Sequence, residues 1–289
     1  MHITKLLFFA LIFFAEISHA DEKIRYARQE TLLDKRDEYP VEMLKLALQE
    51  AGSKSSLEPA PIFMPQGRVL QELEQGRYVD IAWTMTSPER EARLLPIRIC
   101  LYKGLMGWRI PLVTRENEDL LGKVKSLDDL KKMTAGQGYD WPDTGILRSA
   151  GLKVETGTHY ESLFKMLKAS RFDYFPRSVV EIWDEANTAP DSNIVVDQHV
   201  LLRYKVGFYF FVNRNNAALA ETIRCGLEKA LKDGSFNTLF YQYYGDAIHL
   251  AQLGKRTVID IDNNLLPPDT PINRKDLWYV VESGSNPSQ

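Results

Sequence analysis

The sequence contains few of the residues that hold metals or carry redox chemistry. It has two cysteines and five histidines. Only His159, His199 and His249 lie beyond the first twenty residues, and their wide spacing is not that of metal ligands. No H-E-x-x-H, phosphate-binding loop or G-x-G-x-x-G motif is present. The sequence therefore predicts no metal site and no bound cofactor.

An excess of charge of one sign is also lacking. The formal net charge is −3 over 289 residues, and no run of lysine and arginine stands out. Nucleic-acid-binding proteins carry a basic patch or stripe, so we expect no nucleic-acid partner. A hydrophobic share of 44% and a charged share of 26% are typical of a globular protein. This length allows one large domain or two of ordinary size.

One apolar run stands out, at the N-terminus. Lys5 precedes the apolar stretch Leu6–Phe14, and the following Ser18-His19-Ala20 has the small-x-small pattern of a cleavage site. The stretch is shorter than the roughly 20 apolar residues that cross a bilayer. We therefore predict a signal peptide over residues 1–20, cleavage after Ala20 and a periplasmic location.

Predicted strands and helices alternate along the rest of the chain. The helix at 40–51, for example, has apolar residues three and four positions apart and ends before Gly52. Such alternation predicts an α/β fold with mainly parallel sheets flanked by helices. The expected strands are 24–27, 62–64, 79–83, 133–136, 153–156, 172–175, 194–196 and 202–212, and the expected helices are 40–51, 68–75, 126–132, 143–150, 160–169, 179–186 and 217–232.

The segment from Val79 to Trp108 has the most specific pattern in the chain. An apolar strand runs into a polar loop, and Ser87-Pro88 then begins a helix, because serine caps helices and proline suits their first position. Arg90 falls in the first helical turn. There its guanidinium can present a planar set of donors to a carboxylate.

With Asp80, Thr86, Glu89 and Arg90, this segment resembles family 3 extracellular solute-binding proteins, the periplasmic receptors of polar amino-acid ABC transporters. The run LEKALKDGSFNTLFYQYYG resembles the final helix pair of that family. The resemblance covers about residues 24–244. It implies a type II periplasmic binding protein fold with two lobes and two hinge crossovers, near 103–108 and 203–207.

The same resemblance implies the domain limits. Lobe 1 is expected to comprise residues 21–105 and 207–253, and lobe 2 residues 106–206, while 254–289 form a C-terminal extension. Two edge strands, at 258–261 and 278–281, are possible in that extension. Cys100 and Cys225 are expected in one lobe, where they either form a disulfide or remain two separate buried thiols.

In the family, the arginine at the position of Arg90 holds the ligand α-carboxylate. The other expected contacts are hydroxyl groups, aromatic rings and polar groups at the edges of both lobes. The expected ligand-binding residues are Arg28, Glu30, Trp83, Thr84, Thr86, Arg90, Gly138, Tyr139, Trp141, Asp143, Arg177 and Ser178. Some have a plain structural alternative: Asp143 could simply cap a helix, and Trp83 could belong to the core.

The segment RFDYFPRSVVEIW departs from the family pattern. Amino-acid receptors keep an aspartate here that binds the ligand ammonium, whereas this chain has Arg177-Ser178. An arginine repels an ammonium, so the sequence predicts weak binding of α-amino acids and favours a ligand with anionic groups. The alternative is that Arg177 turns away to pair with Glu181, one helical turn later.

These observations predict a monomeric solute-binding protein without catalytic activity. It would capture a small polar, anionic ligand between its lobes for an ABC-type transporter, with a membrane permease or sensor protein as its partner. One alternative is an orphan sensor subunit in the periplasm. The other is a dehydratase-like enzyme on the same fold, for which only Glu30 and Asp143 offer an acid–base group.

Overall fold

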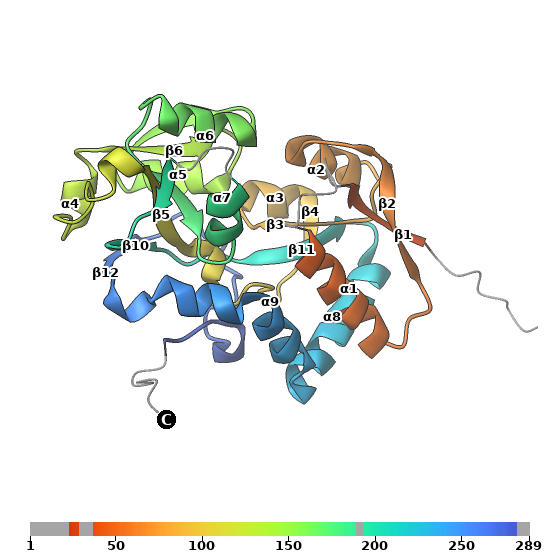
Figure 1. The fold of residues 1–289 in the computed structure, drawn as a ribbon. Coiled ribbons are helices and arrows are strands. Elements are labelled where there is room, and N and C mark those ends of the chain that lie inside the picture. The colour runs from red at the N-terminus through yellow and green to blue at the C-terminus, as the bar shows by residue number, and fades with distance from the viewer. Residues whose placement is uncertain (1–22, 29–36, 189–192, 282–289) are drawn as a thin grey trace, which may run out of the picture.

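The computed structural model describes residues 23–28, 37–188 and 193–281. The predicted signal peptide, Glu30 and the residues beyond 281 lie outside these ranges. Figure 1 shows two lobes, each with a sheet flanked by helices. Within the described ranges, no helix is long and apolar enough to cross a membrane.

Lobe 1 is built on a five-stranded mixed sheet. Its strand order is β2 (Ser56–Phe63), β1 (Lys23–Arg28), β3 (Ile81–Met85), β11 (Phe208–Asn213) and β4 (Leu94–Ile97). β1 is parallel to β2 and β3, whereas β11 is antiparallel to β3 and β4. The chain therefore leaves lobe 1 after β4 and returns later as a strand inside the same sheet.

Helices cover this sheet and close its core. They are α1 (Glu38–Glu50), α2 (Gln66–Glu74), α3 (Pro88–Arg93), α8 (Ala217–Asp233) and α9 (Ser235–Ala251). α1 buries Leu44 and Leu48, as its apolar spacing predicts. It packs so closely on α8 that a Cβ on Gly226 would lie 1.7 Å from the carbonyl oxygen of Ala47, so only glycine fits there. Ser87 caps α3 as predicted, by accepting a hydrogen bond from the Arg90 amide at 3.2 Å.

Lobe 2 contains a mixed sheet and a two-stranded parallel sheet. The larger sheet has the order β12 (Thr257–Asp260), β10 (Val200–Arg203), β5 (Trp108–Thr114) and β8 (Phe175–Ser178), and β9 (Ile194–Val196) also pairs with β5. The smaller sheet joins β6 (Thr134–Gly138) to β7 (Lys153–Gly157). The helices are α4 (Leu127–Leu130), α5 (Pro142–Ser149), α6 (Tyr160–Lys168) and α7 (Ile182–Thr188).

The α/β fold class is confirmed, but the sheets are mixed rather than mainly parallel. β5 is antiparallel to β8, β9 and β10, and β11 is antiparallel to both of its neighbours. A second correction concerns the strand predicted at 172–175. The strand forms at Phe175–Ser178 instead, so Arg177 and Ser178 lie within a buried strand and not after it.

Two crossovers connect the lobes. The first runs from β4 to β5 through a short 3-10 turn, η1 (Leu105–Gly107), and the second is 204–207. They lie against each other: the Tyr204 amide donates to the Gly107 carbonyl at 3.0 Å, and a Cβ on Gly107 would meet the Tyr204 oxygen at 2.1 Å. The single strand predicted at 202–212 is therefore wrong, because the second crossover divides it into β10 and β11, one in each lobe.

The segment 254–281 contacts both lobes and the first crossover. β12 pairs in parallel with β10 of lobe 2, while Arg274 forms an ion pair of 2.5 Å with Glu228 of α8. The Tyr279 amide donates to the Lys103 carbonyl at 2.7 Å, and the ring of Trp278 covers Gly104. The strand predicted near 258–261 is confirmed. That at 278–281 is wrong, since these residues follow a 3-10 turn, η4 (Lys275–Leu277), and form no strand.

The two cysteines are separate, free thiols. Cys100 is buried beyond the end of β4, where its Sγ lies 3.8 Å from the Val206 carbonyl oxygen. Cys225 is partly exposed on α8 and donates to Glu221 Oε1 at 3.1 Å. Of the two alternatives from the sequence, a disulfide is therefore wrong and separate thiols are confirmed, although Cys225 is not buried.

Candidate functional site

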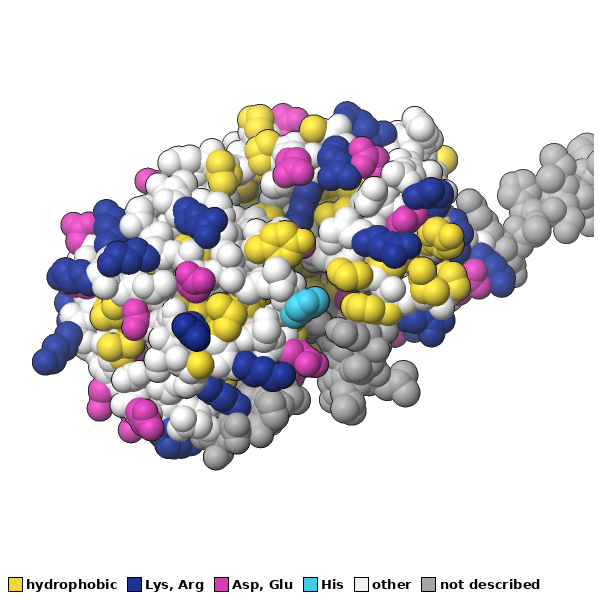
Figure 2. All heavy atoms as spheres, turned by 90° about the horizontal axis from the view of Figure 1, so that it is seen from above, with side chains coloured by type: hydrophobic (Ala, Val, Ile, Leu, Met, Phe, Trp, Pro, Cys, Tyr) yellow, Lys and Arg dark blue, Asp and Glu magenta, His cyan; other side chains and the backbone are white. Residues whose placement is uncertain are grey.

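A cavity of about 340 Å³ lies between the lobes. Its lobe 1 wall comes from the carboxyl ends of β1, β2 and β3 and from α3, and its lobe 2 wall from the loop before α5, the start of α6 and β8. Binding crevices of open α/β sheets form at such strand ends. In Figure 2, which views the molecule from above, hydrophobic side chains are spread over the face among basic and acidic ones, and a histidine lies near its middle. Six aromatic residues line the cavity: Phe63, Trp83, Tyr102, Trp141, Tyr160 and Phe208.

Arg90 joins the two walls of the cavity. Its Nη1 donates to Thr84 Oγ1 at 2.5 Å and to the Met85 carbonyl at 2.8 Å, both at the end of β3. Its Nη2 donates to Gln66 Oε1 at 3.0 Å and, across the cleft, to the Asp140 carbonyl at 3.3 Å. None of these acceptors carries a charge, so the guanidinium is hydrogen-bonded but not neutralised by them.

The electrostatics of Arg90 follow from that arrangement. Burial lowers its pKa to about 10, and the more distant carboxylates of Asp140, Asp143 and Glu89 raise it without restoring the ordinary value. A buried cation without a bonded counter-charge is costly. A carboxylate that entered the cavity and took two of the donors would remove that cost.

Trp83 and Arg28 complete the lobe 1 wall. Trp83 Nε1 donates to Asp37 Oδ1 at 2.8 Å, and its ring lies 5.9 Å from that of Tyr26. Arg28 Nε donates to the Ala60 carbonyl at 2.6 Å. The Trp83 ring both lines the cavity and packs against the core, so the two roles expected for it coexist.

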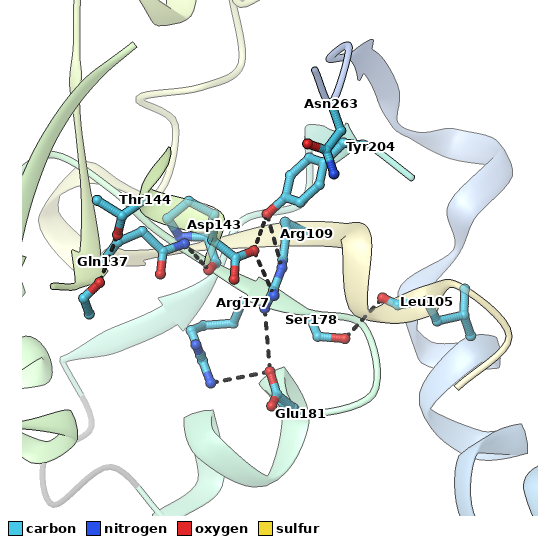
Figure 3. A network of polar contacts seen from close by, with 12 residues as sticks. Leu105, Arg109, Gln137, Asp143, Thr144, Arg177, Ser178, Glu181, Tyr204 and Asn263 are labelled. Carbon is cyan, nitrogen blue, oxygen red and sulfur yellow. Dashed lines mark hydrogen bonds and ion pairs between the residues drawn. The ribbon is translucent and has the colours of Figure 1, made fainter. Parts of the chain in front are cut away.

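In lobe 2, Asp143 belongs to a buried polar network at the base of the cleft (Figure 3). Arg109 Nη2 pairs with Asp143 Oδ1 at 2.7 Å, and Arg109 Nε donates to the Tyr204 hydroxyl at 3.2 Å. Tyr204 in turn donates to Asp143, and burial raises the Tyr204 pKa well above its ordinary value. Asp143 is therefore not the N-cap of α5, a place held by Trp141. It links the start of α5 to the first residues of β5 and to the second crossover.

Arg177 is bound within lobe 2. Its Nε donates to Glu185 Oε2 at 2.7 Å, and its Nη2 donates to Glu185 Oε1 at 2.5 Å and to Glu181 Oε2 at 3.2 Å. Burial opposes the Arg177 charge, but the two carboxylates outweigh it and hold its pKa above the ordinary value. Arg177 is already neutralised, so it cannot form an anion site together with Arg90. The sequence-based reason for two anionic groups on the ligand was therefore wrong.

The structure brings together most of the expected ligand-binding residues. Arg28, Trp83, Thr84, Arg90, Gly138, Trp141, Asp143 and Arg177 line the cavity. Thr86, Tyr139 and Ser178 do not: Thr86 donates to Glu91, Tyr139 is 60% exposed, and Ser178 donates to the Leu105 carbonyl. Glu30 lies outside the described residues.

Sequence reasoning missed several groups of the cavity wall. Arg109 and Asp140 line it, and Tyr204 orients two of its charged residues. The only local signal for Arg109 was its place just after the first predicted crossover, two residues beyond Gly107. Among the residues that the structure describes, no group of His, Cys, Asp or Glu side chains could hold a metal ion.

Comparisons with known proteins find similarity at the level of structure only. No family model matches the chain, and no curated protein does. An ancestral arginine-binding protein bound to arginine superposes with a TM-score of 0.57 and 17% identity, covering 77% of this chain and 97% of the other. A putative ABC-transporter binding component from Wolinella succinogenes, complexed with lysine, superposes with a TM-score of 0.59 at 13% identity. The match covers 80% of this chain and 98% of the other.

A third similar structure is an ancestral amino-acid-binding protein described as a precursor of cyclohexadienyl dehydratase. Its TM-score is 0.55 at 16% identity, with 77% of this chain and 95% of the other covered. Identities this low show the fold and not the ligand. The two-lobed fold predicted from the sequence is thereby confirmed, and the similar structures include substrate-binding proteins of amino-acid ABC transporters.

Proposed function

We propose that this protein is a periplasmic solute-binding protein that captures a small carboxylate-bearing ligand between its lobes and delivers it to a membrane permease or sensor. Arg90 is the observation that carries the proposal. Its partly buried guanidinium meets only uncharged acceptors and reaches from lobe 1 to the backbone of lobe 2. A ligand carboxylate at Arg90 would contact both lobes and favour their closed arrangement.

The cavity wall also suits a ligand that carries an ammonium group. Asp140 and Asp143 both act electrostatically on Arg90, but Asp143 is already paired with Arg109, so Asp140 is the carboxylate near the place proposed for the ligand carboxylate. A zwitterion could place one charge at Arg90 and the other towards Asp140. Since Arg177 is neutralised inside lobe 2, it supplies no repulsion against α-amino acids. We therefore propose an amino acid or a related small carboxylate as the ligand, in place of a dianion.

The size of the cavity agrees with a small solute. Its volume of about 340 Å³ is near the lower end of the range for small-molecule sites. The polar groups at Arg90 and Asp140 would orient the ligand, while the rings of Trp83 and Trp141 cover its apolar part. Transport and sensing would use the same event, a shift from open to closed lobes.

A thermal-shift screen of the purified mature protein tests the proposal. The compounds are the common amino acids, mono- and dicarboxylates and their amides, because a ligand at about 100 times its Kd stabilises the fold by roughly 2.7 kcal/mol. Calorimetry with each hit is then repeated on Arg90→Met. We expect carboxylate hits whose binding is lost in that variant. The absence of any carboxylate hit, or hits that bind Arg90→Met unchanged, would contradict the proposal.

A further inference from the structure

The surroundings of Arg177 have the composition of a binding site for a cation. Three aromatic rings surround its guanidinium carbon, at 4.9 Å from the Trp141 ring, 5.0 Å from the Phe175 ring and 5.6 Å from the Tyr160 ring. Glu185 takes two of its donors, and only 3% of Arg177 is exposed. We call these three rings with Glu181 and Glu185 the cation cage.

The walls of the cation cage are held in place independently of Arg177. The Tyr160 hydroxyl donates to Glu185 Oε1 at 2.8 Å, which orients that carboxylate. The Trp141 and Phe175 rings are nearly parallel, 15° apart, with their centres separated by 6.4 Å. The rings come from the start of α5, from α6 and from β8, and the carboxylates from the segment around α7. Such a preformed combination of π faces and a bidentate acceptor is how proteins bind guanidinium and ammonium groups.

The cation cage is part of the cleft wall. Arg177, Trp141, Tyr160 and Glu181 all line the cavity between the lobes. Every one of its recognition groups would be available to a ligand cation if the Arg177 side chain were absent. Because β8 holds the Arg177 backbone, the chain itself supplies the cation from within lobe 2.

We propose that the cation cage is a subsite of the ligand cleft that Arg177 fills, so that the natural ligand carries no cationic tail. Arg177 is then a residue that determines specificity. It excludes guanidinium- and ammonium-bearing side chains by occupying their place, and it leaves the cleft to compounds with an uncharged or acidic tail. This inference rests on the proposed function, and it concerns ligand class, which the fold does not settle.

The test is binding of methylguanidinium, a probe that needs no knowledge of the natural ligand. Arg177→Ala empties the cation cage, while Arg177→Met refills it with an uncharged stem and serves as the matched control. Thermal unfolding is followed with methylguanidinium chloride at about 20 mM, far below denaturing concentrations. If the Kd for methylguanidinium is about one tenth of this probe concentration, the melting temperature of Arg177→Ala rises by about 3–6 °C. Wild type and Arg177→Met do not respond, and methylurea, the neutral analogue, has no effect on any variant.

Adding Glu185→Gln to Arg177→Ala removes the bidentate acceptor and should abolish the response. If Arg177→Ala alone does not fold, Arg177→Ala with Glu181→Gln replaces it, because this variant loses one carboxylate together with the cation and keeps Glu185 for the probe. A folded variant of either kind that responds to methylguanidinium no more than Arg177→Met overturns the proposal, and Arg177 is then only a structural ion-pair partner. That failure would leave the role of Arg90 untouched, because the probe carries no carboxylate.

Discussion

Replacing Arg90 by methionine should stabilise the protein in the absence of ligand, although it removes four hydrogen bonds. Burial lowers the Arg90 pKa from 12.5 to about 10. At about 1.36 kcal/mol per pKa unit, that difference is a penalty of roughly 3 kcal/mol on the charged side chain. Methionine keeps the apolar stem and removes the charge. Water can replace the lost donors, because the guanidinium is not fully buried.

The expected result is a net stabilisation of about 1–3 kcal/mol, or a rise in melting temperature of about 3–10 °C. The direction of the pH dependence follows from the pKa of about 10. Below pH 10 both folded and unfolded states keep this proton, so the penalty is constant and measurements at pH 6 and pH 9 should agree. Above pH 10 the folded state releases the proton first, and wild-type stability recovers towards that of the variant.

Urea unfolding of the purified mature protein at both pH values measures the effect, with Arg93→Met as the control. Arg93 lies on the same helix, is 40% exposed and pairs with Glu74 at 2.5 Å, so its loss should change stability by less than about 1 kcal/mol. Ligand affinity in Arg90→Met should fall by about 2–5 kcal/mol, roughly 30- to 5000-fold. A loss of more than about 1 kcal/mol of stability in ligand-free Arg90→Met would refute the reasoning, since Arg90 would then be a structural residue.

Three further outcomes are expected. A thiol reagent should titrate one cysteine in the native protein, the partly exposed Cys225, and a second only after denaturation, because Cys100 is fully buried; two native thiols, or none after denaturation, would contradict this. Ser87→Ala should cost about 1 kcal/mol in urea unfolding, since Ser87 caps α3 through the Arg90 amide, whereas an unchanged midpoint would mean that the cap contributes nothing. N-terminal sequencing of the exported protein should begin at Asp21 in the soluble periplasmic fraction, and a membrane-bound product that retains Met1 would disprove cleavage.

Local sequence signals predicted the parts of the fold that depend on near neighbours. Ser87-Pro88 fixed the start of α3 and thereby the position of Arg90, whose environment comes largely from the adjacent end of β3. The apolar spacing of α1 and the alternation of strands and helices likewise needed no distant contact. By contrast, β2 was predicted too short, because Pro59 and Pro61 argue against a strand over its earlier residues. Proline is tolerated there since β2 is the edge strand of its sheet.

The parts of the candidate site that sequence could not predict depend on tertiary partners. The role of Arg177 was misjudged because its main acceptor, Glu185, lies eight residues later, and the pairing requires β8 to begin at Phe175. Arg109 acquires its role only when the second crossover brings Tyr204 beside it. Neither of these contacts produces a periodic pattern or a motif in the sequence. Each can therefore be recognised only from the three-dimensional arrangement of the strands.

The position of β12 has a consequence for the order in which the chain is completed. Lobe 1 begins with β1 yet needs β11 and α8, and the larger sheet of lobe 2 needs β12, whose residues are made more than fifty positions after β10. Domains generally fold as units while the chain emerges. Here neither lobe exists as a continuous stretch, and the edge of β10 stays uncovered until synthesis is almost finished. Folding after nearly the whole chain has been made, with assembly of both lobes at once, is the sequence of events that this connectivity favours.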